Sequence, residues 1–256
     1  MGWGDDLMVL GEAQAKAAEL GGPVEIVDAA GQKVTSPLFI NQPCFAQHGQ
    51  QPMATLALGP GKRPYMAQIA GRIRVWKKYR PKPAKINWLV EEINWIETLP
   101  NDYVVIEPTI KKRSGMANKT WGFDRYQQVV KKLNQIKWVQ LVQDETTPKL
   151  DGVKHIRTFS FRSAMATLSR AIGYLGPEGG LHHASAAVGI PAVVIFGGYI
   201  SPEVTGYEGH INLFTGTGLG CGNADQCECR CMASISVSQV CEAAANLFTQ
   251  ATSPGK

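Results

Sequence analysis

The sequence predicts an α/β fold in which helices cover a parallel sheet. In the second half, short β-rich runs alternate with runs of helical periodicity, which is typical of such a sheet. The chain has 256 residues, 44% of them apolar, so it is long enough to bury a core as one large or two small domains. Its 26 basic and 21 acidic residues give a formal net charge of +5. This composition excludes disordered, collagen-like and coiled-coil proteins.

Apolar runs in the second half predict the strands and helices of the sheet. Residues 103–107 (YVVIE), 138–142 (WVQLV) and 192–196 (AVVIF) are short and rich in β-branched residues, as expected of buried strands. Helical periodicity predicts helices over residues 123–133 and 163–175, and a shorter helix is expected over 181–188. A Gly-Pro pair ends the second of these helices and a glycine ends the third.

The first half is expected to be smaller and more irregular. Residues 8–20 (MVLGEAQAKAAEL) favour a helix that two glycines end, and residues 24–27 favour a short strand. Residues 32–64 are rich in Pro, Gly and Gln and predict loops with short strands. Residues 86–99 favour a helix that contains two tryptophans. These patterns place a domain boundary near Pro100, between domains at 1–99 and 100–256.

Composition also predicts a cytoplasmic protein without a membrane span. The longest uncharged apolar stretch, residues 184–200, contains glycines and a proline and is shorter than the ~20 residues that cross a bilayer. Asp5 and Asp6 stand where a signal peptide would need basic residues. Four of the six cysteines lie within residues 221–231, which is not the spread of a disulfide framework. A reducing compartment is therefore expected.

A glycine-rich turn with two acidic residues opens the first helix. Gly2-Trp3-Gly4-Asp5-Asp6 permits tight backbone turns and places carboxylates near the positive end of the helix dipole. One interpretation is an Asp N-cap in a turn. The other is that one carboxylate faces a cleft between domains as a general base.

Two loops at the carboxyl edge of the predicted sheet contain candidate phosphate ligands. The loop from Glu107 to Trp121 contains four cations and Thr109, and a hydroxyl with a lysine such as Lys119 suits a diphosphate. A solvated basic loop is the alternative. The second loop has Gly179-Gly180 at a predicted helix start, where free N–H groups and the dipole attract phosphate. Such turns are also common without a ligand, and a nearby histidine can be a core residue.

The clustered cysteines do not have the usual spacing of a zinc site. Cys221, Cys227, Cys229 and Cys231 form C-x5-C-x-C-x-C, without paired C-x2-C knuckles. Reduced packing thiols, an occasional disulfide and metal binding all stay open, and we expect a structural role.

A basic segment gives a second functional hypothesis. Residues 72–85 contain seven basic and no acidic residues, together with Trp76 and Tyr79. Such a run can neutralise phosphates and stack bases, which suggests a protein associated with nucleic acid. The alternative is a face of a linker between the domains, helped by two prolines.

Four segments, taken in chain order, carry a family resemblance. Gly4-Asp5 opens a helix, Lys119 stands just before Thr120-Trp121, residues 178–197 read EGGLHHASAAVGIPAVVIFG, and a Cys-Met pair precedes the final helix. Together they resemble glycosyltransferase family 9, the ADP-heptose:lipopolysaccharide heptosyltransferases. The chain departs from the family in Glu178, where the usual residue is Asp, and in its short N-terminal half with a missing or reduced first strand.

The resemblance implies the two-domain GT-B fold, in which two Rossmann-like domains face a cleft, here with a reduced N-terminal domain. It implies a glycosyltransferase that moves a sugar from a nucleotide-sugar donor to an acceptor hydroxyl, with inversion and without a metal or other cofactor. The N-terminal domain then binds the acceptor and the C-terminal domain the donor. The last helix, about residues 236–249, is expected to pack back toward the N-terminal domain.

The same resemblance assigns the expected site residues. Asp5 is the expected base, with Asp6 as its rival, because only one of two adjacent helical residues can face the cleft. The expected donor-binding residues are Thr109, Lys119, Glu145, Glu178, Gly179, Gly180 and His183, with Glu145 on the ribose or base.

The acceptor stays open between a lipopolysaccharide-type glycan and a modified nucleic acid. A catalytically inactive module that binds sugar nucleotides is a further alternative, because the acceptor half is short.

Overall fold

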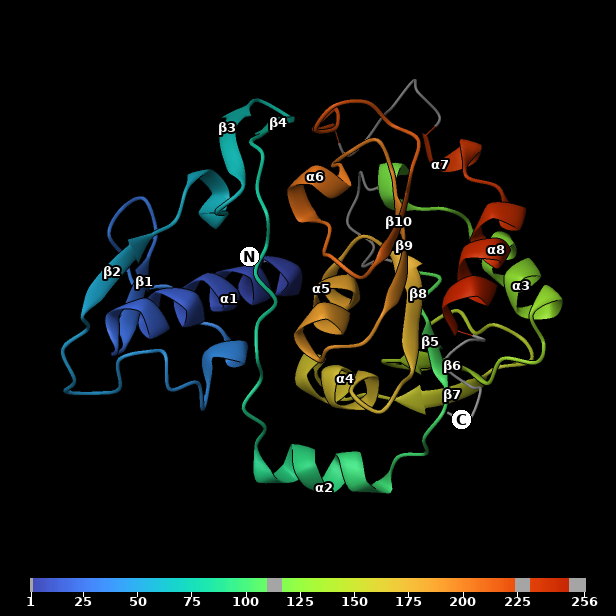
Figure 1. Ribbon diagram of the computed structural model, residues 1–256, viewed down its shortest axis with the longest axis horizontal. Helices are drawn as coiled ribbons and strands as arrows, with labels where there is room; N and C mark the ends of the chain where they lie inside the picture. The colour runs from blue at the N-terminus through green and yellow to red at the C-terminus, as the bar shows by residue number, and fades with distance from the viewer. Residues whose placement is uncertain (1, 110–116, 224–230, 249–256) are drawn as a thin grey trace.

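The computed structural model describes residues 2–109, 117–223 and 231–248, and a six-stranded parallel sheet forms its centre (Figure 1). The strand order is β10-β9-β8-β5-β6-β7, in which β5 is the first strand along the chain. This is the doubly wound order, which reverses direction between the first and fourth strands. That reversal lies between β5 and β8. The strands are β5 (Val104–Ile106), β6 (Trp138–Val142), β7 (Lys154–Arg157), β8 (Gly173–Pro177), β9 (Ala192–Phe196) and β10 (Ile211–Phe214).

Alternate residues of each central strand face opposite layers of helices. Val105 belongs to the core that contains α4 and α5, whereas Val104 and Ile106 belong to the core that contains α3 and α8. Because both faces are covered, the strands are apolar without alternation, which explains why the sequence predicts buried strands. The helices are α3 (Phe123–Lys132), α4 (Phe161–Leu168), α5 (Gly180–Ala187), α6 (Pro202–Thr205), α7 (Cys231–Ser234) and α8 (Val237–Phe248).

Two expectations for the second half are wrong. Residues 163–175 do not form one helix: α4 ends at Leu168 and the buried strand β8 begins at Gly173. The ring of Phe248 lies where a Cβ on Gly173 would be, at 2.3 Å, so this glycine lets α8 cover the strand closely. Helix α8 therefore packs against α3 and the sheet, on the side away from α1 (Figure 1). It does not pack back toward the N-terminal part.

The N-terminal part is an irregular layer built on a long helix. Helix α1 (Trp3–Leu20) precedes a parallel strand pair, β1 (Val24–Val27) with β2 (Ala54–Ala57), and an antiparallel hairpin follows, β3 (Met66–Ala70) with β4 (Ile73–Trp76). Among the described residues this part contains no second Rossmann-like sheet, because the connections between its strands are rich in Pro, Gly and Gln and supply few apolar runs. Helix α2 (Val90–Thr98) packs on α4, and single 3-10 turns occur at η1 (Pro37–Phe39), η2 (Pro60–Lys62) and η3 (Ala117–Lys119).

The N-terminal helix joins the two parts by lying directly on α5. A Cβ on Gly4 would come within 2.3 Å of the His183 ring, so only glycine permits this approach. Leu7 and Leu10 of α1 share one buried core with Met165 of α4 and Ala184 of α5. The first turn of α1 is thereby fixed beside the first turn of α5.

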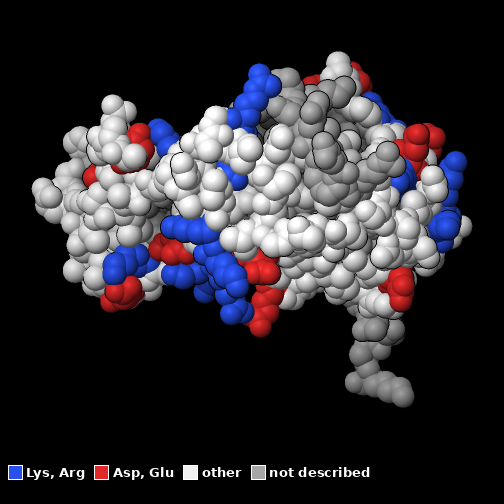
Figure 2. Space-filling model, turned by 90° about the horizontal axis from the view of Figure 1, so that it is seen from above, with Lys and Arg blue, Asp and Glu red and all other residues white. Residues whose placement is uncertain are grey.

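The aromatic residues of the basic segment point into the protein. Trp76 is buried and its Nε1 donates to the carbonyl of Tyr199 at 2.8 Å, and the Tyr79 hydroxyl donates to Glu12 at 2.9 Å. Neither ring is free to stack on a nucleobase. Basic and acidic side chains alternate over the junction of the two parts (Figure 2), and three of the segment's cations form ion pairs there, Lys78 with Glu203, Arg80 with Glu208 and Lys82 with Glu12.

Across the described ranges, no helix combines the length and apolarity that a bilayer crossing requires.

Replacing Gly4 with Ala should destabilise the protein. The new methyl group would collide with the His183 ring, and overpacking of this kind costs about 1–3 kcal/mol although Ala is the better helix former. The measurement is thermal or urea unfolding. Gly179→Ala is the control, since no atom lies within 4 Å of its Cβ position. Equal stability of the two variants would contradict the close contact.

Candidate active site

The candidate site lies at the carboxyl edge of the sheet, where β5 and β8 meet. Open α/β sheets bind ligands at this reversal of strand order. Glu107 follows β5, and Glu178 follows β8 just before α5 begins at Gly180. The chain thus brings two carboxylates and a helix start to one place.

A buried ion pair with a histidine occupies the centre of this edge. The Lys119 ammonium contacts Oε2 of Glu178, and Oε1 of the same carboxylate lies 3.5 Å from Nε2 of His183. Burial opposes ionisation of Glu178, but Lys119 and His183 outweigh it and hold its pKa below the usual range. Lys119 also lies 5.0 Å from the centre of the Tyr199 ring. Three residues that the sequence predicted, Lys119, Glu178 and His183, are therefore in contact.

The start of α5 has backbone N–H groups that no described side chain caps. Its N-cap is Gly179, and within the described chain no side chain caps the helix. The first backbone N–H groups and the helix dipole consequently remain for a ligand. At Gly180 the Phe161 ring lies 3.1 Å from the position of a Cβ, so a larger residue would have to displace Phe161.

Asp5 lies near this site, and its carboxylate accepts hydrogen bonds from three donors. Its Oδ1 accepts hydrogen bonds from Nε of Arg63 at 3.0 Å and from the Tyr65 hydroxyl at 2.6 Å, and its Oδ2 accepts from the backbone N–H of Gly2 at 3.0 Å. Burial and the Asp5 carboxylate raise the pKa of Tyr65, and the charge of Glu178 adds to that shift. Asp5 directly follows Gly4, whose Cβ position lies 2.3 Å from the His183 ring, so Asp5 stands beside the first turn of α5.

Asp6 faces a different environment. Its Oδ2 accepts a hydrogen bond from the Ser36 hydroxyl at 2.7 Å, and its Oδ1 has no partner among the described residues. Burial raises the pKa of Asp6. The two neighbouring carboxylates thus point to different parts of the structure, as their positions on a helix require.

Sequence reasoning missed Glu107 as a site residue. Its Oε1 accepts hydrogen bonds from the backbone N–H of Thr109 at 2.8 Å and from the Thr109 hydroxyl at 2.6 Å. Burial raises the pKa of Glu107 to about 7, against the lowering effect of these bonds. The predicted Thr109 hydroxyl is therefore engaged by this carboxylate. A carboxylate directly after the first strand at the reversal point was the available signal.

Arg63 and Tyr65 were also missed. They lie between η2 and β3, in a segment whose only visible pattern was its Pro and Gly content.

Glu145 stands apart from this group. Its side chain is exposed and pairs with Lys149 at 3.1 Å, four residues along the chain. Within the described ranges no contact links it to Lys119, Glu178 or His183.

The histidines beside Glu178 form a buried cluster that could hold a metal ion. Ligand atoms of Glu178, His182 and His183 lie within 4.8 Å of one another. Burial lowers the pKa of His182, so its ring is neutral, and both of its nitrogens lack a partner among the described residues. His183 Nδ1 lies 2.9 Å from the Tyr207 hydroxyl, and Lys119 already neutralises Glu178. Among the described residues, these three side chains are the group that could hold a metal ion at this edge.

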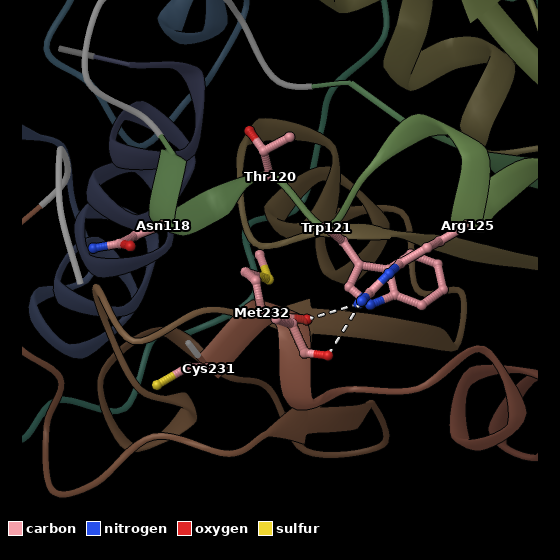
Figure 3. A pocket seen from close by; sticks show the side chains of 7 residues that line it. Asn118, Thr120, Trp121, Arg125, Cys231 and Met232 are labelled. Atoms are coloured by element: carbon pink, nitrogen blue, oxygen red, sulfur yellow. Dashed lines mark hydrogen bonds between the residues drawn. The ribbon is translucent and has the colours of Figure 1, made fainter. Parts of the chain in front are cut away.

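A small pocket of about 260 Å³ is lined by Asn118 and Thr120, the neighbours of Lys119 in the chain, and by residues of α3 and α7 (Figure 3). Arg125 donates to the carbonyls of Met232 and Ala233 across it, and Trp121 forms one wall. Cys231 is buried at its edge, whereas Cys221 is exposed. Cys227 and Cys229 lie outside the described residues, so the role of the cysteine cluster stays a prediction.

Comparisons with solved structures place the chain among glycosyltransferase folds. A glycosyltransferase of family 9 from Veillonella parvula superposes with a TM-score of 0.67 and 12% identity over 98% of this chain and 95% of that one. The iron-containing dodecameric heptosyltransferase TibC, solved with ADP-D-β-D-heptose, gives 0.54 and 18% over 78% of this chain and 61% of TibC. E. coli ADP-heptose lps heptosyltransferase II gives 0.49 and 15% over 70% of this chain.

These similarities are similarities of fold. The chain spans 55% of the length of the E. coli heptosyltransferase II but nearly all of the Veillonella protein. No protein-family model and no curated protein matches it. The expected resemblance to family 9 heptosyltransferases is confirmed at the level of fold, and the α/β class with its parallel sheet is confirmed with it.

Replacing Glu107 with Gln should change how stability depends on pH. The folded protein holds the Glu107 proton up to about pH 7, whereas the ordinary pKa of a glutamate side chain is 4.5. Ionisation therefore favours the unfolded chain, and the stabilising effect of the bound proton is lost as pH rises through this window. Glu107→Gln cannot ionise and should be more stable than the parent protein at pH 8, by roughly 2–3 kcal/mol, but not at pH 4.

Urea unfolding of both proteins at the two pH values measures this difference. Glu145→Gln is the matched control, because that side chain is exposed. A pH-independent difference for Glu107→Gln would contradict the raised pKa.

Proposed function

We propose that this protein is a glycosyltransferase that moves a sugar from a nucleotide-sugar donor to an acceptor hydroxyl. The observation that carries the proposal is the start of α5, which has no side-chain cap among the described residues and lies beside the partly buried Lys119 at the reversal point of a doubly wound sheet. This arrangement suits the diphosphate of a donor. The fold similarity to a family 9 glycosyltransferase along nearly the whole chain supports it.

The leaving group needs stabilisation of developing negative charge. In the proposed reaction the bond from the anomeric carbon to the diphosphate breaks, and the diphosphate leaves with the bonding electrons. Backbone N–H groups of Gly180 and Leu181 and the ammonium of Lys119 supply fixed positive charge. The proposed reaction therefore needs no metal. The buried Glu178 carboxylate, which His183 also contacts, holds the Lys119 ammonium in place.

The acceptor hydroxyl needs a base on the opposite side of the sugar. We assign this role to Asp5, which takes the hydroxyl proton as the oxygen bonds to the anomeric carbon. A single displacement of this kind inverts the anomeric centre. Arg63 and Tyr65 orient the carboxylate by donating to its Oδ1.

The two-domain GT-B arrangement and the acceptor role of residues 1–99 belong to this proposal. A cytoplasmic location also belongs to the proposal, and the free thiols of Cys44 and Cys241 support it. The related structures suggest an ADP-sugar as the first donor to test, because TibC was solved with ADP-D-β-D-heptose. The remaining proposed donor contacts are Thr109 and Gly179.

Lys119→Ala should weaken nucleotide-diphosphate binding. A hydrogen bond to a charged group is worth about 1.5–3 kcal/mol, so the loss in affinity is roughly tenfold to a hundredfold. Titration calorimetry with ADP, GDP, UDP and dTDP measures it. Lys119→Arg should restore part of the affinity, and Lys149→Ala, which removes an exposed lysine, should change nothing. Unchanged affinity in folded Lys119→Ala would remove this lysine from the site.

Asp5→Asn should retain the fold and the donor affinity but lower turnover. The amide is nearly isosteric and still accepts hydrogen bonds, whereas it cannot take a proton; loss of a general base costs ~100-fold or more. Donor turnover at saturating acceptor measures the effect. Loss of turnover in Asp6→Asn alone would move the base by one residue. Donor binding without turnover in the parent protein would support an inactive binding module instead.

A further inference from the structure

A second cavity lies on the N-terminal side of the proposed donor site. It has a volume of about 350 Å³ and opens between the first turn of α1, the segment before η1 and the end of η2. Trp3, Asp6 and Ser36 are among its lining residues. Trp3 also reaches the donor side, because its Cβ lies 3.5 Å from the position of a Cβ on Gly180. The cavity therefore adjoins the place where the diphosphate would bind.

The polar groups of this cavity are those that bind hydroxyls. Asp6 is only 6% exposed, and its Oδ1 has no hydrogen-bond partner in the part of the chain that the structure describes. A buried carboxylate oxygen without a partner is costly, and a ligand hydroxyl would satisfy it. Ser36 and Thr35 also line the cavity and bring two more hydroxyl-bearing side chains to it. Ser36 is already bonded to the other oxygen of Asp6.

An aromatic ring forms the apolar wall of the cavity. Trp3 stacks on Phe161 with ring centroids 5.2 Å apart and planes inclined by 6°, yet it remains 39% exposed. Phe161 covers one side of the indole, so the exposed remainder is available to a ligand. Sites that combine a rigid aromatic wall with a few placed polar groups bind ligands with an apolar face and a polar edge. A pyranose ring has this character.

The cations at the rim are neutralised. Lys33 pairs with Glu25 at 3.4 Å, and Lys62 pairs with Asp28 at 3.0 Å. Lys62 has a left-handed backbone with φ of 59° at the end of η2. With both lysines paired, the charge left over in the cavity is that of the Asp6 carboxyl. An anionic ligand would meet this carboxylate without a free cation to offset it.

We propose that this cavity binds an uncharged saccharide unit of the acceptor, with its ring face on Trp3 and a hydroxyl donating to Asp6. The inference rests on the proposed function, since it names the class of acceptor for that reaction. Asp6 is then a residue that determines acceptor specificity, beside the base Asp5. Both carboxylates act on one acceptor: Asp6 binds it, and Asp5 takes the proton from its reacting hydroxyl.

Saturation-transfer NMR on the full chain without nucleotide tests the proposal. The probes are methyl α-mannopyranoside, methyl β-glucopyranoside and methyl β-galactopyranoside, with glucuronic acid and glucose 6-phosphate as charged comparisons. We expect at least one uncharged glycoside to bind and the charged sugars not to bind. Binding of the charged sugars as strongly as the glycosides, or binding of none of the probes, would overturn the proposal.

Variants connect this binding to the cavity. Trp3→Ala and Asp6→Asn should each weaken glycoside binding tenfold or more, whereas Phe159→Ala, which removes an exposed aromatic side chain elsewhere, should leave it unchanged. Trp3 is partly exposed, so its variant carries the test if Asp6→Asn fails to fold. Full glycoside affinity in both variants would refute the assignment.

Glycoside binding without sugar transfer would refute the proposed function alone, and nucleotide binding with no glycoside bound would refute this inference alone.

Discussion

The approach of α1 to α5 is the constraint on which the rest of the structure depends. The backbone of Gly4 lies so close to the ring of His183 that no side chain fits between them. Everything that follows Gly4 on α1 is therefore held at a fixed distance from the start of α5. A site assembled from two helices in different parts of a chain needs such a contact, because a displacement of about 1 Å can cost a hundredfold in rate.

The electrostatics of the edge depend on a second constraint, the burial of Glu178. A carboxylate that is only 5% exposed is stable as an ion because Lys119 and His183 accompany it. Removing one partner of a buried pair typically costs about 3–5 kcal/mol, since a charge is left alone in a poor solvent. The pair therefore holds Lys119 at the helix start before any ligand arrives. Preorganised charge of this kind needs no rearrangement during reaction.

Sequence patterns predicted some of the fully buried strands but not all of them. Strands β6 and β9 are buried on both faces, and their residues were predicted without error because apolar β-branched runs have few alternatives. Strand β8 was assigned to a helix, since Met165, Leu168 and Ile172 continue the helical spacing across the turn that separates α4 from β8. Tertiary packing of Phe248 on Gly173 decides this boundary, and no local pattern reports it.

The residues of the candidate site also differ in how well the sequence predicted them. Lys119, Glu178 and His183 were predicted because a family pattern places them in order along the chain, and the fold brings them into contact. Glu145 was predicted from the position of a strand end alone, and its side chain lies in solvent. Arg63 and Tyr65 reach Asp5 from 58 and 60 residues away, and a separation of that length leaves no trace in a single sequence.

Two adjacent carboxylates on one helix can have two different roles, one as a base and one as a binding group. Successive helical residues point about 100° apart, so Asp5 and Asp6 cannot share an environment. Asp5 is surrounded by donors that keep it in place, while Asp6 is bonded to Ser36 on one oxygen and has no partner for the other among the described residues. The first arrangement orients a carboxylate, and the second leaves a buried acceptor that gains most from a ligand hydroxyl. A single turn of helix, fixed by the contact at Gly4, thereby supplies both a positioned base and a binding group for the molecule on which it acts.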